Sequence, residues 1–166
     1  VNKKDYSLKS TIKNSIFETN QFLLNQEQLT LIKYATFYGS SQIFKYLYKN
    51  GVDFTPSLWL CVVHSKSEEI IQILEENKVD MDSHLNNQNF DYLNDELYEY
   101  ILIESIYCHH NDVYNYIEQR FQNDCDVSKY GIFNYNFIYF PKDIDDKELF
   151  LYSCIYDYFI IVEHLL

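Results

Sequence analysis

Residues 29–53 read L-T-L-I-K-Y-A-T-F-Y-G-S-S-Q-I-F-K-Y-L-Y-K-N-G-V-D. The first half places apolar residues at helical spacing up to Ala35, and the second half repeats that spacing. Between the halves, Gly39 suits the left-handed residue that ends a helix, and Ser41 suits the cap of the next one. Asn50-Gly51 closes the second half. The stretch therefore predicts two short antiparallel helices joined by a tight turn.

The same pattern returns three times along the chain. A small or β-branched residue stands at Ala35 and again 27, 70 and 118 positions later, as Val62, Ser105 and Ser153. Two apolar residues follow eight and nine positions later in each copy: Ile43–Phe44, Ile70–Ile71, Val113–Tyr114 and Ile161–Val162. We expect the small site to lie tightly between neighbouring copies and Lys33 to lie on a solvated side.

Four copies in order predict an all-α fold, a repeat array (α-solenoid) of antiparallel helix pairs. The copies span about residues 29–53, 55–80, 97–121 and 147–166, and the last one is truncated. In the second copy, Thr55 and Pro56 are expected to open the first helix as its cap and first-turn proline.

Three segments lie outside this pattern. Residues 1–28 are expected to form an N-terminal capping helical segment, because their apolar residues follow a helical period: Leu8, Ile12, Ile16, Phe17, Phe22 and Leu23. Irregular insertions fall around 82–94 and 122–146. The first insertion fits an exposed loop or a short extra helix near Tyr92, and the second fits a small hairpin or an extra helix packed on the array.

Residues 29–53 resemble the ankyrin consensus T-P-L-H-x-A-A-x-x-G-H-x-x-I-V-x-x-L-L-x-x-G-A-D. The matching positions are Thr30, Ala35, Gly39, Ile43, Phe44, Leu47, Gly51 and Asp53. The turn glycine is replaced in the later copies by Lys66, His109 and Asp157, and the T-P-L-H motif survives only in pieces. From residue 29 to its end the chain resembles the divergent ankyrin-repeat proteins expanded in trichomonad protists. This resemblance implies an ankyrin-like repeat array and carries no catalytic motif.

The composition bounds the class of protein and its partners. With 166 residues, 47% hydrophobic and 18% aromatic, the chain is too apolar for a disordered tail. A formal net charge of −12 disfavours nucleic acid and anionic membranes as partners and would attract a basic protein surface. Four cysteines without a C-x-x-C pair favour the reducing cytoplasm. Because the chain begins without Met and stops in mid-pattern, we expect a fragment of a longer protein.

Motifs for catalysis or cofactor binding are missing from the sequence. It contains no G-x-G-x-x-G, phosphate-binding loop, H-E-x-x-H or G-x-S-x-G motif. Cys108-His109-His110 resembles a metal-ligand cluster, but adjacent histidines on a helix diverge by about 100°. The acidic residues at 143–148 are expected to solvate a loop and the start of the next helix. We therefore expect no enzyme, no metal and no cofactor.

In ankyrin-type stacks, the two residues before each inter-helix turn point to a concave face. Carried over to this chain, the resemblance implies a protein-binding stripe made of Phe37, Tyr38, His64, Ser65, Tyr107, Cys108, Ile155 and Tyr156. Tyrosine is enriched at protein interfaces. The alternative is that Phe37, Tyr107 and Ile155 only fill spaces left by small neighbours.

The sequence thus favours a non-catalytic protein–protein interaction scaffold. Two other classes remain open, a regulatory ankyrin segment of a larger enzyme and a self-assembling structural protein.

Overall fold

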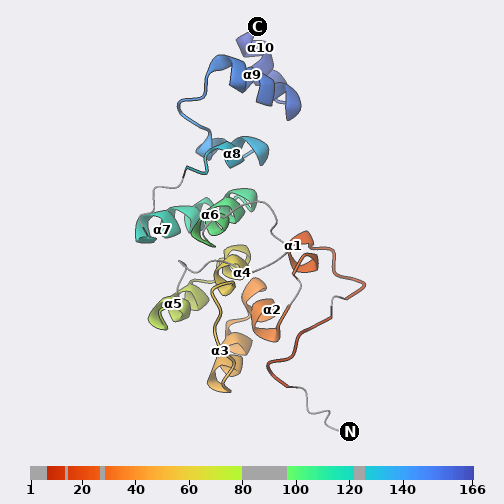
Figure 1. Cartoon of the computed structure of the whole chain (residues 1–166), viewed down its shortest axis with the longest axis vertical. Coiled ribbons are helices and arrows are strands. Elements are labelled where there is room, and N and C mark those ends of the chain that lie inside the picture. The colour runs from red at the N-terminus through yellow and green to blue at the C-terminus, as the bar shows by residue number, and fades with distance from the viewer. Residues whose placement is uncertain (1–6, 14, 27–28, 80–96, 122–125) are drawn as a thin grey trace. The chain divides into compact units, whose positions relative to one another are not determined.

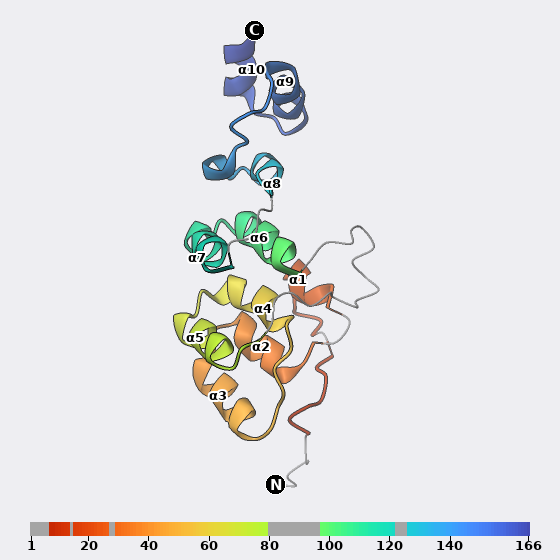
Figure 2. The same cartoon turned by 60° about the vertical axis from the view of Figure 1, so that its left-hand side comes forward.

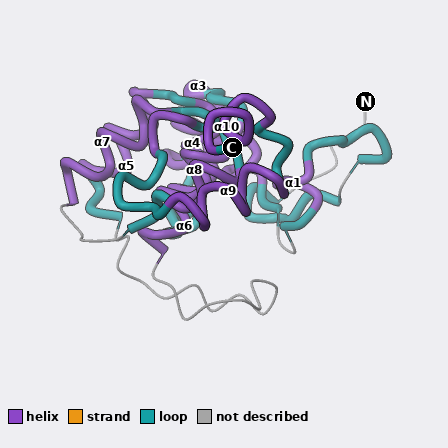
Figure 3. Tube along the Cα trace, turned by 90° about the horizontal axis from the view of Figure 1, so that it is seen from above, coloured by secondary structure: helices purple, strands orange, loops and turns teal. Residues whose placement is uncertain are grey.

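The computed structural model describes residues 7–13, 15–26, 29–79, 97–121 and 126–166. Every regular element in these ranges is helical (Figure 3). An isolated bridge pairs Thr11 with Thr30. The prediction of an all-α protein is confirmed. No helix in the described part of the chain is long and apolar enough to span a bilayer. The chain divides into two compact units, Val1–Ile101 and Leu102–Leu166.

The helices follow one another in short, closely spaced pairs (Figure 1). They are α1 (Gln21–Leu24), α2 (Leu31–Phe37), α3 (Ser41–Lys49), α4 (Leu58–Ser65), α5 (Glu68–Glu76), α6 (Leu97–Tyr107), α7 (Asn111–Phe121), α8 (Lys129–Phe133), the 3₁₀ helix η1 (Phe137–Tyr139), α9 (Asp146–Ile155) and α10 (Phe159–Leu165). The boundary between the two units falls inside α6.

The turns inside the pairs share one backbone conformation. Gly39 has φ +64°, as predicted for the residue that ends α2. The positions matched to it by the repeat spacing are also left-handed, although none is glycine: Lys66 (φ 51°), His109 (φ 55°) and Asp157 (φ 57°). Left-handed backbone is unfavourable for residues with a side chain. Its recurrence at matched positions therefore reflects a shared requirement of the turn.

Hydrogen bonds close three of these turns in the same way, and in the fourth the N–H of Lys66 donates to the carbonyl of Val62 at 3.0 Å. The N–H of Ser40 donates to the carbonyl of Ala35 at 2.8 Å, and the N–H of Gly39 donates to Thr36 at 3.0 Å, which together make a Schellman motif. The equivalent bonds join His110 to Ser105 at 2.9 Å and Tyr158 to Ser153 at 2.8 Å. All four small-site residues of the predicted copies are buried: Ala35, Val62, Ser105 and Ser153.

A fifth pair of the same kind lies inside the predicted insertion 122–146. Gly131, 96 positions after Ala35, accepts a bond from the N–H of Asn136 at 2.9 Å, and Tyr135 between them has φ 55°. The second helix is reduced to η1 because Phe140 precedes Pro141 and is extended (φ −61°, ψ 135°). Of the two alternatives for this insertion, the described residues contain the extra helix, and the hairpin near 135–139 is not formed.

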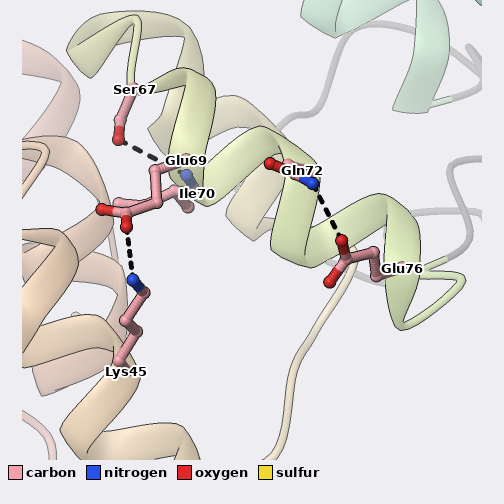
Figure 4. Close-up of polar contacts among 6 residues, drawn as sticks. All are labelled: Lys45, Ser67, Glu69, Ile70, Gln72 and Glu76. Carbon is pink, nitrogen blue, oxygen red and sulfur yellow. Dashed lines mark hydrogen bonds and ion pairs between the residues drawn. The ribbon is translucent and has the colours of Figure 1, made fainter.

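In the first unit, the two helix pairs stack on each other. Helix α2 packs against α4 and α3 against α5 (Figures 1 and 2). At the turn, Gly39 lies close to Ser65 of the second pair. Figure 4 shows the ion pair that joins Lys45 of α3 to Glu69 of α5. The same view shows the Ser67 hydroxyl capping α5 at the N–H of Ile70, and Gln72 donating to Glu76.

In the second unit, the fifth pair bonds to the pairs on both sides of it. The side chain of Asn136 donates to the carbonyl of Ile106 at 3.2 Å and to Asn111 at 2.8 Å. On the other side, the Tyr135 hydroxyl donates to the carbonyl of Tyr156 at 2.7 Å. The three pairs of this unit are thus linked turn to turn.

Two predicted helix starts are displaced. Helix α4 begins at Leu58 after the cap residue Ser57, and the predicted opening residues Thr55 and Pro56 form a preceding turn whose first carbonyl accepts from the N–H of Leu58. The cap of α3 is Ser40 rather than Ser41, and its side chain makes no capping bond. Both errors are of the size usual at helix ends.

The predicted helix across residues 8–25 is wrong. Among the described residues of this segment only α1 is helical, and Ile16 and Phe17 are 91% and 85% exposed instead of lining a buried face. Serine side chains bond locally to the backbone here, as where Ser15 accepts from the N–H of Phe17, and such bonds compete with a helix. The predicted loop or helix at 82–94, near Tyr92, lies outside the described residues.

Lys33 is buried rather than solvated, with 9% of its surface exposed. Residues of the 52–57 loop, together with Lys9, line the same pocket as Lys33. Lys9 and the 52–57 loop therefore lie next to a side of α2 that the spacing of its apolar residues predicts to face solvent.

Candidate protein-binding surface

The first predicted contact residues stand at the end of α2. Phe37 is buried, with its ring stacked on Phe22 at 5.7 Å between centroids and tilted against His64 at 4.5 Å. It belongs to a core cluster that includes Leu23 and Cys61. This packing agrees with the alternative that Phe37 fills space inside the fold.

Tyr38 is largely exposed but already has polar partners. Its hydroxyl and that of Tyr34 both donate to the Glu18 carboxylate, at 3.4 and 3.3 Å. Hydrogen bonding with Tyr34, burial and the Glu18 charge together raise the pKa of Tyr38 to about 12. The phenol is therefore neutral over the physiological pH range, and the N-terminal segment lies beside it.

His64 and Ser65 occupy the matching positions of α4. The half-buried His64 ring lies 4.4 Å from that of Phe22. The Ser65 hydroxyl donates to the carbonyl of Val62 at 3.1 Å and accepts from the N–H of Ser67 at 3.3 Å. In the first unit, the N-terminal segment thus covers much of the predicted stripe, and Ser65 supports the turn.

The second unit leaves its predicted residues more accessible. Tyr107 and Ile155 are 60% and 59% exposed. The half-buried Cys108 points its thiol toward Glu104, with Sγ and Oε1 3.8 Å apart. Tyr156 is half-buried against the ring of Phe133 at 5.2 Å. The fifth pair lies between the copies that carry Tyr107 and Ile155, so these two side chains do not belong to neighbouring helix pairs as predicted.

Sequence reasoning missed two exposed apolar pairs that follow the turns of this unit. Phe137-Ile138 and Phe159-Ile160 open η1 and α10, and their side chains are largely exposed. The matched positions in the other copies are polar: Ser41-Gln42, Glu68-Glu69 and Asn111-Asp112. The sequence does carry a signal for these two pairs, because they are apolar at a repeat position where the other copies are polar.

These residues flank the turns of the second unit on either side. The Phe137 ring lies 5.4 Å from that of Tyr158, which directly precedes Phe159. We use the name turn surface for the six exposed side chains of Tyr107, Phe137, Ile138, Ile155, Phe159 and Ile160. Their chemistry suits contact with apolar groups of another molecule.

Comparison with known proteins assigns no family to this chain. No family model, no curated protein and no solved structure matches it. Its function is therefore inferred from the geometry above.

Proposed function

We propose that this chain is a non-catalytic protein-binding module of the ankyrin-like kind, which acts in the cytoplasm. The observation that carries the proposal is the turn surface, where two copies place apolar pairs at positions that are polar in the other copies. The ankyrin-like relationship is supported by the consensus matches in residues 29–53 and by the stacking of α2 on α4 and α3 on α5.

Exposed apolar side chains are costly in water, by roughly 25 cal/mol for each Å² of accessible surface. Clusters of them on a folded domain commonly mark binding sites, and aromatic residues such as Phe159 commonly dominate the binding energy there. The net charge of −12 adds a long-range attraction for a basic partner. The proposed partner is therefore a protein with an apolar contact surface and basic residues around it.

The test exchanges the residues of one copy for those of another. In Phe159→Ser with Ile160→Gln, the start of α10 acquires the residues that open α3. A matched control, Ile16→Gln with Phe17→Ser, removes an even more exposed apolar pair from the N-terminal segment. Both variants should melt like the parent, because exposed substitutions change stability by about 0.5 kcal/mol or less.

Affinity capture from a cell extract, with the partner identified by mass spectrometry, then separates the two variants. The α10 variant should lose a protein that the parent and the control variant retain. Equal recovery of every protein by all three baits would refute the proposed surface.

A self-assembling structural protein is the second candidate, because the same apolar pairs can pair with another copy of the chain. Light scattering of the purified chain distinguishes the two. A dimer or polymer that the α10 variant converts to monomer would favour self-assembly, and a monomeric parent would favour a separate partner.

A further inference from the structure

A lysine with a largely buried side chain and no ion pair to a described residue lies in the first unit, far in sequence from the turn surface. Lys33 is 9% exposed, and its ammonium has no hydrogen bond or ion pair to any described residue. The stem of this side chain is buried while the ammonium still reaches water, so its positive charge is accessible and has no counter-ion among the described residues. The position therefore invites a negatively charged ligand.

Lys33 lines a pocket of about 240 Å³. The other polar residues around this pocket come from three parts of the chain, namely Lys9, Thr30 and the 53–57 loop. Pockets for drug-sized ligands measure roughly 300–1,000 Å³. The space accordingly suits one small group better than a nucleotide or a long peptide.

The charges around the pocket leave one positive charge uncompensated. Lys9 lies 2.7 Å from a carboxylate oxygen of Asp53, and its ammonium holds the pKa of that carboxyl below its usual value. These two side chains neutralise each other, and Lys33 supplies the remaining charge. A net positive pocket stands out in a chain with a net charge of −12.

Hydroxyl donors add to this charge. The Thr30 oxygen accepts from the backbone N–H of Lys33 at 3.4 Å, which leaves the Thr30 proton available to donate. The hydroxyls of Thr55 and Ser57 are 3.0 Å apart, so that one donates to the other and the second proton remains available. Donors from separate segments thus border the same small space.

We propose that this pocket binds a monophosphate group, either as inorganic phosphate or as a small phosphate ester. A phosphate offers three or more acceptor oxygens in a tetrahedral arrangement, which matches an ammonium and two hydroxyls better than the planar pair of oxygens of a carboxylate. The ligand compensates the charge of Lys33 and bridges α2 to the loop before α4. The proposal is independent of the turn surface.

The test is a titration of the ¹⁵N-labelled chain with inorganic phosphate, at constant ionic strength set with sodium chloride. Phosphate should move the backbone amide signals of Thr30, Lys33 and Thr55 in a saturable way. Lys33→Gln should weaken binding at least tenfold, and Lys49→Gln, at an exposed lysine of α3, should leave it unchanged. A parallel titration with O-phosphoserine shows whether the pocket prefers a phosphate ester or inorganic phosphate. A titration with acetate tests the preference for phosphate over a carboxylate, and acetate should bind at least tenfold more weakly than either phosphate compound.

Signals that do not saturate, or that respond equally in Lys33→Gln, would overturn the proposal, and so would acetate binding as tightly as phosphate. Thr55→Val supplies a second variant in case Lys33→Gln does not fold. It should weaken phosphate binding severalfold, and unchanged binding would count against the site.

Discussion

Gly131 lies so close to Tyr139 that a β-carbon added at Gly131 would stand 2.6 Å from the Tyr139 carbonyl oxygen. Backbone cannot move aside as a flexible side chain can. Glycine to alanine in a helix normally stabilises a protein by roughly 0.5–1 kcal/mol. In Gly131→Ala we expect the opposite sign, a loss of about 1–3 kcal/mol from overpacking. Chemical denaturation of the two proteins measures this difference, and a more stable variant would show that η1 does not pack on α8 as described.

Ser153 should be replaceable with a gain in stability. Its buried hydroxyl has no hydrogen-bond partner among the described residues, and the matched residue in the first copy is Ala35. Ser153→Ala removes an unsatisfied group, which should stabilise the protein by about 1 kcal/mol. For a chain of this length, that raises the melting temperature by roughly 2–4 °C. A lower melting temperature would mean that the hydroxyl is satisfied in solution.

Ala35→Glu should be far more harmful than Lys49→Glu. Ala35 is buried at the small site between the first two helix pairs, where a longer, charged side chain must overpack the stack or lose its hydration. Lys49 is exposed at the end of α3. We expect the first variant to melt roughly 6 °C or more below the parent and the second to melt within about 2 °C of it. Equal melting temperatures would invalidate the register that relates the copies.

Phe22 should stabilise the first unit by holding the N-terminal segment against α2 and α4. Its half-buried ring contacts those of Phe37 and His64, so Phe22→Ala should cost about 2 kcal/mol, less than the 3–5 kcal/mol of a fully buried phenylalanine. Phe17→Ala, at an exposed ring, is the matched control.

Removal of residues 1–28 should likewise lower the melting temperature and leave the far-ultraviolet circular dichroism helical. An unchanged melting temperature after that deletion would show that the segment is no cap.

The spacing of the copies is what the sequence predicts best. Lys66, His109 and Asp157 are left-handed although only the first copy has glycine at the matched position, Gly39. In each copy the turn stands between a buried small residue and the apolar pair. Each predicted copy contains two helices, and their second helices begin at matched positions: Ser41, Glu68, Asn111 and Phe159.

The predictions that were wrong have local causes that the spacing of apolar residues does not reveal. The apolar period of residues 8–25 is real, but short-range bonds such as that from the N–H of Lys9 to the Ser7 hydroxyl compete with the helix. The fifth pair was missed because Pro141 shortens its second helix and removes the apolar repeat. Lys33 was placed in solvent because the loop that covers it carries no period.

The candidate site was predicted only in part, for a related reason. Repeat position identifies which side chains stand beside a turn, as with Tyr107 and Ile155, and both are exposed. It does not show that Phe22 of another segment covers Phe37. That contact depends on where the N-terminal segment returns to the stack, which no repeat pattern specifies.

The central claim is that the turn surface binds a partner protein. The most direct test uses the double variant Tyr107→Ala with Ile155→Ala. Its dissociation constant for the captured partner and its melting temperature are both compared with those of the parent. The control is Tyr46→Ala with Ile43→Ala, the same two residue types at 58% and 56% exposure on the second helix α3. The account predicts unchanged melting for both variants and, with about 2 kcal/mol for a central aromatic, roughly thirtyfold weaker binding for the first alone. Equal dissociation constants for the two variants would contradict it.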